Sequence, residues 1–224
     1  MESYFGGKNG NGTLQTILSM IPEHKYYVEG FTGSGAIIRN KKKCLCDIGF
    51  ELDRAVIDKY HYRSSYTILN YSFLEFISKV NPLYLLDTFI YLDPPYLNST
   101  RQSSKRYVFE MSVQNHIDLI NCVISLKCKI MISGYNSALY SSMLEGWNTK
   151  TFLSMTRGGM REETIWMNYD CSKDIYNYDY LGVNYTDRQR IKRKVLRIVS
   201  KINSLPILER KCILSAIIVD SKKW

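Results

Sequence analysis

The chain has 224 residues, of which 45 % are hydrophobic and 23 % are charged, and its formal net charge is +9. This length and composition are those of one globular domain with a sizeable core and at most a small appendage. No stretch reaches the roughly 18 apolar residues of a membrane span, and residues 1–12 lack the apolar segment of a signal peptide. We therefore expect a cytoplasmic protein with no membrane partner.

The cysteines show neither C-x-x-C pairing nor a histidine at zinc spacing. We expect reduced, mostly buried thiols and no metal site. The six residues are Cys44, Cys46, Cys122, Cys128, Cys171 and Cys212.

Most of the positive charge lies in residues 185–224, which contain 11 basic and 3 acidic side chains, whereas residues 1–184 carry a net charge of only about +1. A polyanion is the natural partner of such a segment, although a solvated helix face would have the same composition. We predict two parts, a domain over residues 1–184 and a basic helical tail over residues 185–224. The sequence leaves monomer and dimer open.

Two glycine-rich stretches stand near the N-terminus. In Tyr4-Phe5-Gly6-Gly7-Lys8, the glycines allow close approach of a ligand to the backbone, and the lysine adds a positive charge. Residues 26–29 then predict a strand that leads into the turn Gly30-Phe31-Thr32-Gly33-Ser34-Gly35. A glycine turn between a strand and a helix suits a dinucleotide or S-adenosylmethionine, but Ile38 replaces the last glycine of G-x-G-x-x-G, which disfavours a nicotinamide site.

Residues 44–47 predict a second strand with Asp47 at its carboxyl end. A carboxylate there suits hydrogen bonding to a ribose or an adenine edge, although it could equally cap the next helix. Residues 66–69 predict a third strand, and Ser72 and Phe73 follow it at the start of a helix. They are candidate contacts for the adenine edge of a bound nucleotide.

The apolar run over residues 83–92 predicts a buried strand that must end at Pro94-Pro95, because proline has no N–H to donate to the sheet. Asp93 and the carbonyl of Pro94 are two acceptors that could hold both hydrogens of an exocyclic amine, and Tyr96 offers a face for stacking a base. The simpler alternative is a strand that ends in a proline turn with a solvated aspartate.

Polar and basic residues follow in a non-periodic loop over residues 97–107, which includes Arg101, Lys105 and Arg106. Such a loop could contact phosphates, although an ordinary surface loop would look the same. Residues 129–133 predict another strand, and residues 151–155 and 164–168 predict an edge hairpin whose turn carries Arg157 and Arg161.

The tail predicts two helices. Thr186-Asp187-Arg188-Gln189 has the pattern of a capping box, and Pro206 starts the second helix. Apolar residues lie on one face of the first helix and basic residues elsewhere, among them Arg193, Lys194 and Arg197.

Asp93-Pro94-Pro95-Tyr96 after an apolar strand is similar to motif IV of amino-methyltransferases that modify adenine N6 in DNA. The other motifs follow in the order of the Dam-like (D12 class) family, including small phage-type members with similar tails. The resemblance covers nearly the whole chain. It departs from the family between Phe73 and Tyr91, where fewer than twenty residues stand in place of an inserted target-recognition domain.

The resemblance implies a Rossmann-like S-adenosylmethionine-dependent methyltransferase fold, an α/β fold with a mostly parallel sheet and an antiparallel edge hairpin. It implies catalytic roles for Asp93, Pro94, Pro95 and Tyr96. The residues expected to contact the methyl donor are Tyr4, Lys8, Glu29, Phe31, Gly33, Ser34, Gly35, Asp47, Ser72, Phe73 and Asp93. Those expected to contact DNA are Arg101, Lys105, Arg106, Arg157, Arg161, Arg193, Lys194 and Arg197.

The function expected from this sequence is methyl transfer from S-adenosylmethionine to N6 of a flipped-out adenine in DNA, at a short or relaxed target. Methylation of RNA adenine or of cytosine N4 stays open, because both substrates present a similar amine. A catalytically silent fold that binds DNA through its tail is the alternative from another class.

Overall fold

The computed structural model describes residues 7–8, 12–61, 64–100, 108–156, 159–172 and 175–221, except for the side chains of residues 155, 156 and 221. The chain separates into two compact units, Met1–Tyr178 and Asp179–Trp224. Each unit is described by itself.

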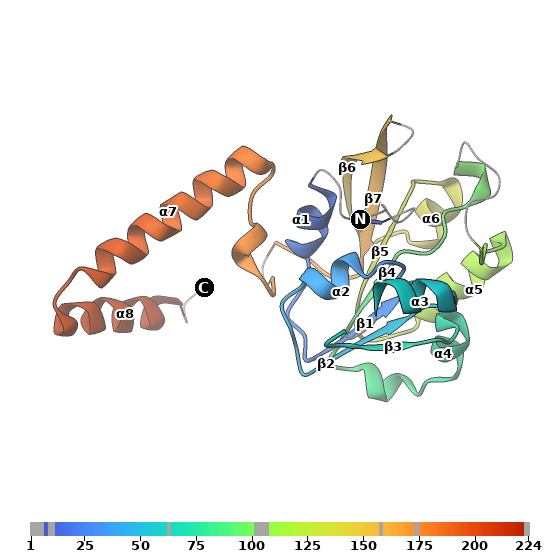
Figure 1. The fold of residues 1–224 in the computed structure, drawn as a ribbon, viewed down its shortest axis with the longest axis horizontal. Coiled ribbons are helices and arrows are strands. Elements are labelled where there is room, and N and C mark those ends of the chain that lie inside the picture. The colour runs from blue at the N-terminus through green and yellow to red at the C-terminus, as the bar shows by residue number, and fades with distance from the viewer. Residues whose placement is uncertain are drawn as a thin grey trace. The chain divides into compact units, whose positions relative to one another are not determined.

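The first unit is built on a sheet that, within the described residues, has seven strands in the order β3-β2-β1-β4-β5-β7-β6 (Figure 1). Strands β1 to β5 pair in parallel, whereas β7 runs antiparallel to both β5 and β6. The predicted α/β fold, a mostly parallel sheet with an antiparallel edge hairpin, is therefore confirmed. The strands are β1 (Tyr26–Gly30), β2 (Cys46–Phe50), β3 (Thr67–Leu69), β4 (Thr88–Leu92), β5 (Lys129–Gly134), β6 (Asn148–Thr156) and β7 (Gly159–Met167).

Side chains alternate across the strands, so each face of the sheet has its own apolar set. On one face, residues such as Val28, Ile90, Ile130 and Trp166 form a core with α4, α5 and α6. The opposite face carries the residues between them, and α1 and α2 pack against each other in the same unit. The helices are α1 (Thr13–Leu18), α2 (Ala36–Asn40), α3 (Arg54–Tyr60), α4 (Phe73–Lys79), α5 (Val113–Ile124) and α6 (Ala138–Met143).

The strand predicted over residues 83–92 is shorter than expected. Residues Pro82–Leu85 form a 3-10 turn, and β4 begins only at Thr88. The Asn81 side chain accepts a hydrogen bond from the Leu83 N–H at 3.0 Å, which stabilises the turn locally against an extended chain. The end of β4 at Leu92, directly before Asp93, agrees with the prediction.

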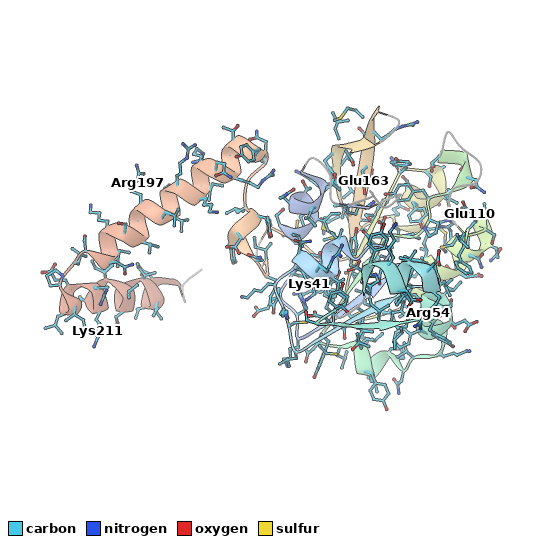
Figure 2. The ribbon with its side chains drawn as sticks, in the orientation of Figure 1. Lys41, Arg54, Glu110, Glu163, Arg197 and Lys211 are labelled. Atoms are coloured by element: carbon cyan, nitrogen blue, oxygen red, sulfur yellow. The ribbon has the colours of Figure 1, made fainter. Side chains whose placement is uncertain are left out.

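The second unit contains α7 (Tyr185–Asn203) and α8 (Ile207–Ser221) after a 3-10 turn at Tyr178–Tyr180. The predicted capping box at Thr186 is wrong. Asn184 caps α7 instead, because its side chain accepts from the Asp187 N–H at 2.9 Å. Arg193, Lys194 and Arg197 are all exposed on α7. Arg197 is labelled in Figure 2.

The cysteines differ in part from the expectation. All six cysteines are free thiols, but only Cys128 is buried, so the expectation that most are buried is wrong. Among the described residues, no helix is long and apolar enough to cross a membrane. No cluster of three or more histidine, cysteine or acidic side chains in the described ranges has a metal-binding arrangement.

Candidate active site at the carboxyl edge of the sheet

The turn after β1 lies at the carboxyl edge of the sheet, where parallel α/β proteins bind ligands. Phe31, Gly33 and Gly35 all have positive φ angles, of 77°, 51° and 70°. A non-glycine residue in this region is uncommon and costs conformational energy, so the strain at Phe31 marks the turn as a special site. The Phe31 ring is packed edge-on against Phe73 at the start of α4, with 5.9 Å between ring centroids.

Gly35 serves packing. A Cβ atom there would lie 2.7 Å from Cε1 of His61, and the backbone already has a left-handed conformation. The His61 ring supports the turn from below, since its Nε2 is 2.7 Å from the Gly33 carbonyl and its Nδ1 is 3.0 Å from the Tyr66 hydroxyl. Gly35 does not line the cavity described below, in contrast to its predicted contact with a donor.

The carboxyl end of β2 carries Glu51, and the prediction for Asp47 is wrong in its placement. Because β2 runs over Cys46–Phe50, Asp47 stands near its amino end, where it pairs with Lys41. The strand continues through Ile48, Gly49 and Phe50, a run whose central glycine obscures the strand in the sequence. Gly49 is required because a Cβ atom there would lie 2.5 Å from both Ile68 and Thr32.

Glu51 is tied to the glycine turn. Its carboxylate accepts hydrogen bonds from the N–H groups of Gly33 and Asp53, both at 2.8 Å. Burial raises the pKa of Glu51 above its ordinary value. The side chain thus links the first two βα turns and presents its remaining acceptor sites at the cavity.

Asp93 follows β4 and sits at the centre of a charged cluster. The Lys8 ammonium lies 3.0 Å from Oδ1 of Asp93 and 2.7 Å from Oε1 of Glu163 on β7. The Tyr96 hydroxyl donates to Glu163 at 3.2 Å and contacts Lys8. Ser133 on β5 donates to Asp93 at 3.1 Å. Four separate segments of the chain therefore meet at this aspartate.

Burial and charge set the protonation of this cluster. Burial alone would lower the pKa of Lys8, but the carboxylates of Asp93 and Glu163 outweigh it and raise the pKa well above its usual value. Burial, opposed by Lys8 and assisted by Glu163, raises the pKa of Asp93 to about 6. Asp93 is thus ionised at neutral pH yet more basic than an ordinary aspartate.

Glu29 forms a second buried carboxyl group close by, on β1. Its Oε2 accepts from the Tyr27 hydroxyl at 2.7 Å, and the residue is only 2 % exposed. Burial raises the pKa of Glu29 to about 8, although the Tyr27 hydrogen bond opposes the shift. Glu29 is therefore a neutral acid over much of the physiological range.

A cavity joins these parts. It extends from the glycine turn past the ends of β2 and β4 to residues 108–111. Of the predicted donor contacts, it is lined by Lys8, Glu29, Phe31, Gly33, Ser34, Ser72, Phe73 and Asp93, and of the predicted catalytic residues by Asp93 and Pro95. Gly35, Asp47, Pro94 and Tyr96 do not line it. Tyr4, Arg101, Lys105, Arg106 and Arg157 lie outside the described residues.

Ser34 gives an independent sign that the cavity receives a polar ligand. Its hydroxyl is buried and, among the described residues, has no hydrogen-bond partner. A buried hydroxyl without a partner is costly, so a ligand that hydrogen-bonds to it at the glycine turn would relieve that cost.

Comparison with known proteins supports the architecture. No family model and no curated protein sequence matches the chain. Among solved structures, a spermidine synthase in complex with the transition state analogue AdoDATO is 13 % identical with a TM-score of 0.51, covering 87 % of this chain and 71 % of that one. Spermidine synthase from Thermotoga maritima is 14 % identical with a TM-score of 0.50, covering 77 % of this chain and 66 % of that one. The chain has the Rossmann-like methyltransferase fold.

At these identities the similarity shows the fold alone. A putative methyltransferase, yhhF, from Escherichia coli is also similar, at 15 % identity and a TM-score of 0.44, with 69 % of this chain and 81 % of that one covered. The function of this methyltransferase fold must therefore be argued from its own residues.

Sequence reasoning missed three residues of the site. Glu51 was missed because the second strand was predicted to end at Asp47, whereas β2 ends at Phe50. Ser133 and Glu163 lie on strands whose side-chain direction the sequence does not give. Tyr135 is also close, with its ring centroid 4.4 Å from that of Tyr96. A signal for Glu163 was present, because it directly precedes the predicted strand over residues 164–168, where a carboxylate that is buried needs a partner.

Proposed function

We propose that this protein transfers a methyl group from S-adenosylmethionine to the N6 amine of adenine in DNA. The observation that carries the proposal is Asp93, a mostly buried carboxylate at the end of β4 that opens into the cavity beneath the glycine turn. The turn is suited to the methyl donor and the carboxylate to an amine, and the two line the same cavity.

The residues around the cavity fit the donor. S-adenosylmethionine supplies, when bound, a methyl group on a positively charged sulfonium. Ser34 has a buried hydroxyl in need of a partner, and Glu51 has free acceptor sites suited to ribose hydroxyls. Phe73 and Tyr71, at the start of α4, provide aromatic surface along the same cavity. These residues would hold the donor.

Asp93, which lines the cavity, would hold the acceptor amine. The carbonyl of the adjacent Pro94, a residue that does not itself line the cavity, would be the second acceptor for this amine. Two acceptors aimed at its hydrogens direct the nitrogen lone pair outward, toward the methyl carbon. The N–C bond forms as the S–C bond breaks and its electron pair goes to sulfur, and the methylated nitrogen then releases one proton to the Asp93 carboxylate. Positioning and electrostatics would supply most of the rate enhancement.

The basic character of the chain supports a nucleic-acid substrate. Residues 185–224 carry most of the net charge, and Arg193, Lys194 and Arg197 are exposed on α7. The target adenine must leave the duplex before its amine can reach a recessed carboxylate. Because the chain has no inserted recognition domain, we expect a short or relaxed target sequence.

Transfer of labelled methyl groups to oligonucleotides tests the proposal. DNA and RNA oligomers would each contain either adenine or cytosine as the only base with an exocyclic amine of this kind. We expect label in the adenine-containing DNA. Transfer only to RNA or only to cytosine would overturn the substrate assignment, and donor binding without transfer to any oligomer would indicate a silent fold.

A further inference from the structure

Glu163 is a buried carboxylate that the proposed chemistry does not use. It stands on β7 (labelled in Figure 2) and is 3 % exposed, and its Oε1 contacts both the Lys8 ammonium and the Tyr96 hydroxyl. Glu162, its neighbour on the same strand, points to the other face and is exposed. An ionised side chain is buried at this level only when it is paired.

The pairing is unequal, because one cation serves two carboxylates. The Lys8 ammonium contacts Glu163 at 2.7 Å and Asp93 at 3.0 Å. If Asp93 alone held Lys8, the ion pair would neutralise it and make it a weak proton acceptor. With Glu163 present, the positive charge is divided between two acids.

We propose that Glu163 is a positioning residue that shares Lys8 with Asp93, keeping Asp93 basic enough to take the proton of the methylated amine, and that anchors the Tyr96 hydroxyl. This inference rests on the proposed function. It assigns to Glu163 two effects that act through neighbouring residues, and Glu163 itself touches neither substrate.

The surroundings of Asp93 single out Glu163 as the group that sets its basicity. Among the described residues, the ionisable and polar groups around Asp93 are Lys8, Glu29 on β1, Tyr91 on β4, Tyr96, Ser133 on β5, Tyr135, Tyr140 on α6 and Glu163 on β7. Glu29 is neutral near pH 6 because its pKa is about 8, and burial raises the pKa values of Tyr91, Tyr135 and Tyr140 above their ordinary value. Lys8 and Glu163 are therefore the charges that compete for control of Asp93.

Glu163→Gln separates the two effects. Glutamine keeps an oxygen that can accept from Tyr96 and Lys8 but removes the negative charge. The positive charge of Lys8 then acts on Asp93 alone and lowers the pKa of Asp93. We expect the acid-side fall of kcat/KM to move to lower pH by on the order of one unit, with a lower rate at the plateau. Glu162→Gln removes one charge from the same strand and should leave the profile unchanged.

Glu163→Ala tests the anchor. It also removes the group that accepts a hydrogen bond from the Tyr96 hydroxyl, and Tyr96 is the ring expected to stack on the target base. The KM for the nucleic acid should therefore rise by about 5-fold, whereas Glu163→Gln should leave this KM near the wild-type value. If Glu163→Ala does not fold, the profile of Glu163→Gln still decides the question. An unmoved acid-side fall in folded Glu163→Gln would overturn the proposal.

A second readout does not depend on activity. The carboxyl carbon of Asp93, labelled with carbon-13 and assigned by comparison with Asp93→Asn, can be titrated by NMR in the wild type and in Glu163→Gln without substrate. A lower midpoint in Glu163→Gln supports the sharing of Lys8. Equal midpoints in the two proteins refute the sharing of Lys8. If the wild type transfers no methyl group to any nucleic acid, only the proposed function is refuted.

Discussion

Asp93 differs from a surface aspartate in two respects that matter for catalysis. It is held by groups from two other segments, Lys8 and Ser133, and its pKa of about 6 leaves it ionised yet basic at neutral pH. Substitution of Asp93 should leave the fold intact, because the buried Lys8 ammonium keeps Glu163 as its ion-pair partner.

We expect Asp93→Ala and Asp93→Asn to lower methyl transfer by about 100-fold or more. Asp93→Ala removes the acceptor that holds the amine in the transition state, and Asp93→Asn removes the negative charge and the carboxylate that takes the proton. The donor should bind both variants with affinity close to that of the wild type, as measured by calorimetry. Asp87→Asn, at the exposed opposite end of β4, is the matched control. Wild-type turnover in folded Asp93→Ala would contradict the assigned role.

Glu29 predicts a pH dependence of stability. Its pKa is about 8 in the folded protein, against an ordinary value of 4.5. Between these values the folded state binds a proton that the unfolded state has released, so Glu29 makes the fold less stable as the pH rises, by up to about 1.4 kcal/mol per pH unit. Glutamine accepts the Tyr27 hydrogen bond without this penalty.

Denaturant unfolding of Glu29→Gln and of the wild type from pH 5 to pH 9 measures the difference. We expect the variant to gain stability over the wild type as the pH rises to about 8, and the gain to level off above it. Glu23→Gln, an exposed substitution just before β1, should show no such trend. A difference that stays constant with pH would show that Glu29 is ionised in the folded protein.

At the level of elements, the two ends of β2 carry acidic residues with different contacts. The sequence had placed the expected donor contact of this strand on Asp47 alone. Glu51 stands at the carboxyl end beside the glycine turn, and Asp47 at the amino end beside Lys41. The parallel sheet brings only carboxyl ends to the cavity edge, so direction along the strand decides which acid can meet the donor.

Calorimetric titration with S-adenosylmethionine distinguishes the two acids. Glu51→Gln should weaken donor binding by about 10-fold, because it replaces a charge-assisted acceptor by a neutral one. Asp47→Asn should leave donor affinity unchanged and lower stability, since Lys41 then loses its buried partner. Weaker donor binding in Asp47→Asn with unchanged binding in Glu51→Gln would show that Asp47, and not Glu51, contacts the donor.

At the level of the whole molecule, charge and chemistry are carried by different units. The first unit holds the cavity, and residues 185–224 hold most of the excess positive charge. Phosphate contacts from such a segment add affinity without reading sequence, which is consistent with the relaxed target that we propose.

Replacing Arg193, Lys194 and Arg197 by glutamine in one variant should weaken DNA binding. The slope of log Kd against the logarithm of the salt concentration should fall by about 2 to 3. Neutralising Lys79, Lys127 and Lys129, which are exposed on the first unit and do not line the cavity, is the charge-matched control. Fluorescence anisotropy at several salt concentrations gives both slopes. Equal slopes for the two variants would show that α7 does not contact phosphate.

The sequence by itself determined the features that depend on consecutive residues. The end of β4 before Asp93 follows from two prolines, and the turn after β1 follows from its glycines, so both could be placed without a structure. The mostly parallel sheet with an edge hairpin was expected from the family resemblance that these motifs carry, and the structure confirms it. Where a local pattern was ambiguous, as at Gly49 in β2 or at Asn184 before α7, the boundary was placed wrongly.

Only the tertiary structure decided which polar and charged side chains contact one another in the site. Ser133 lies 40 positions from Asp93, and Glu163 lies 67 positions from Tyr96, yet each pair is hydrogen-bonded. Strand order and the direction of side chains across the sheet bring these residues together, and neither is written in any local pattern. Their burial then raises the pKa values of Asp93 and Glu29, because desolvation depends on everything packed around a group.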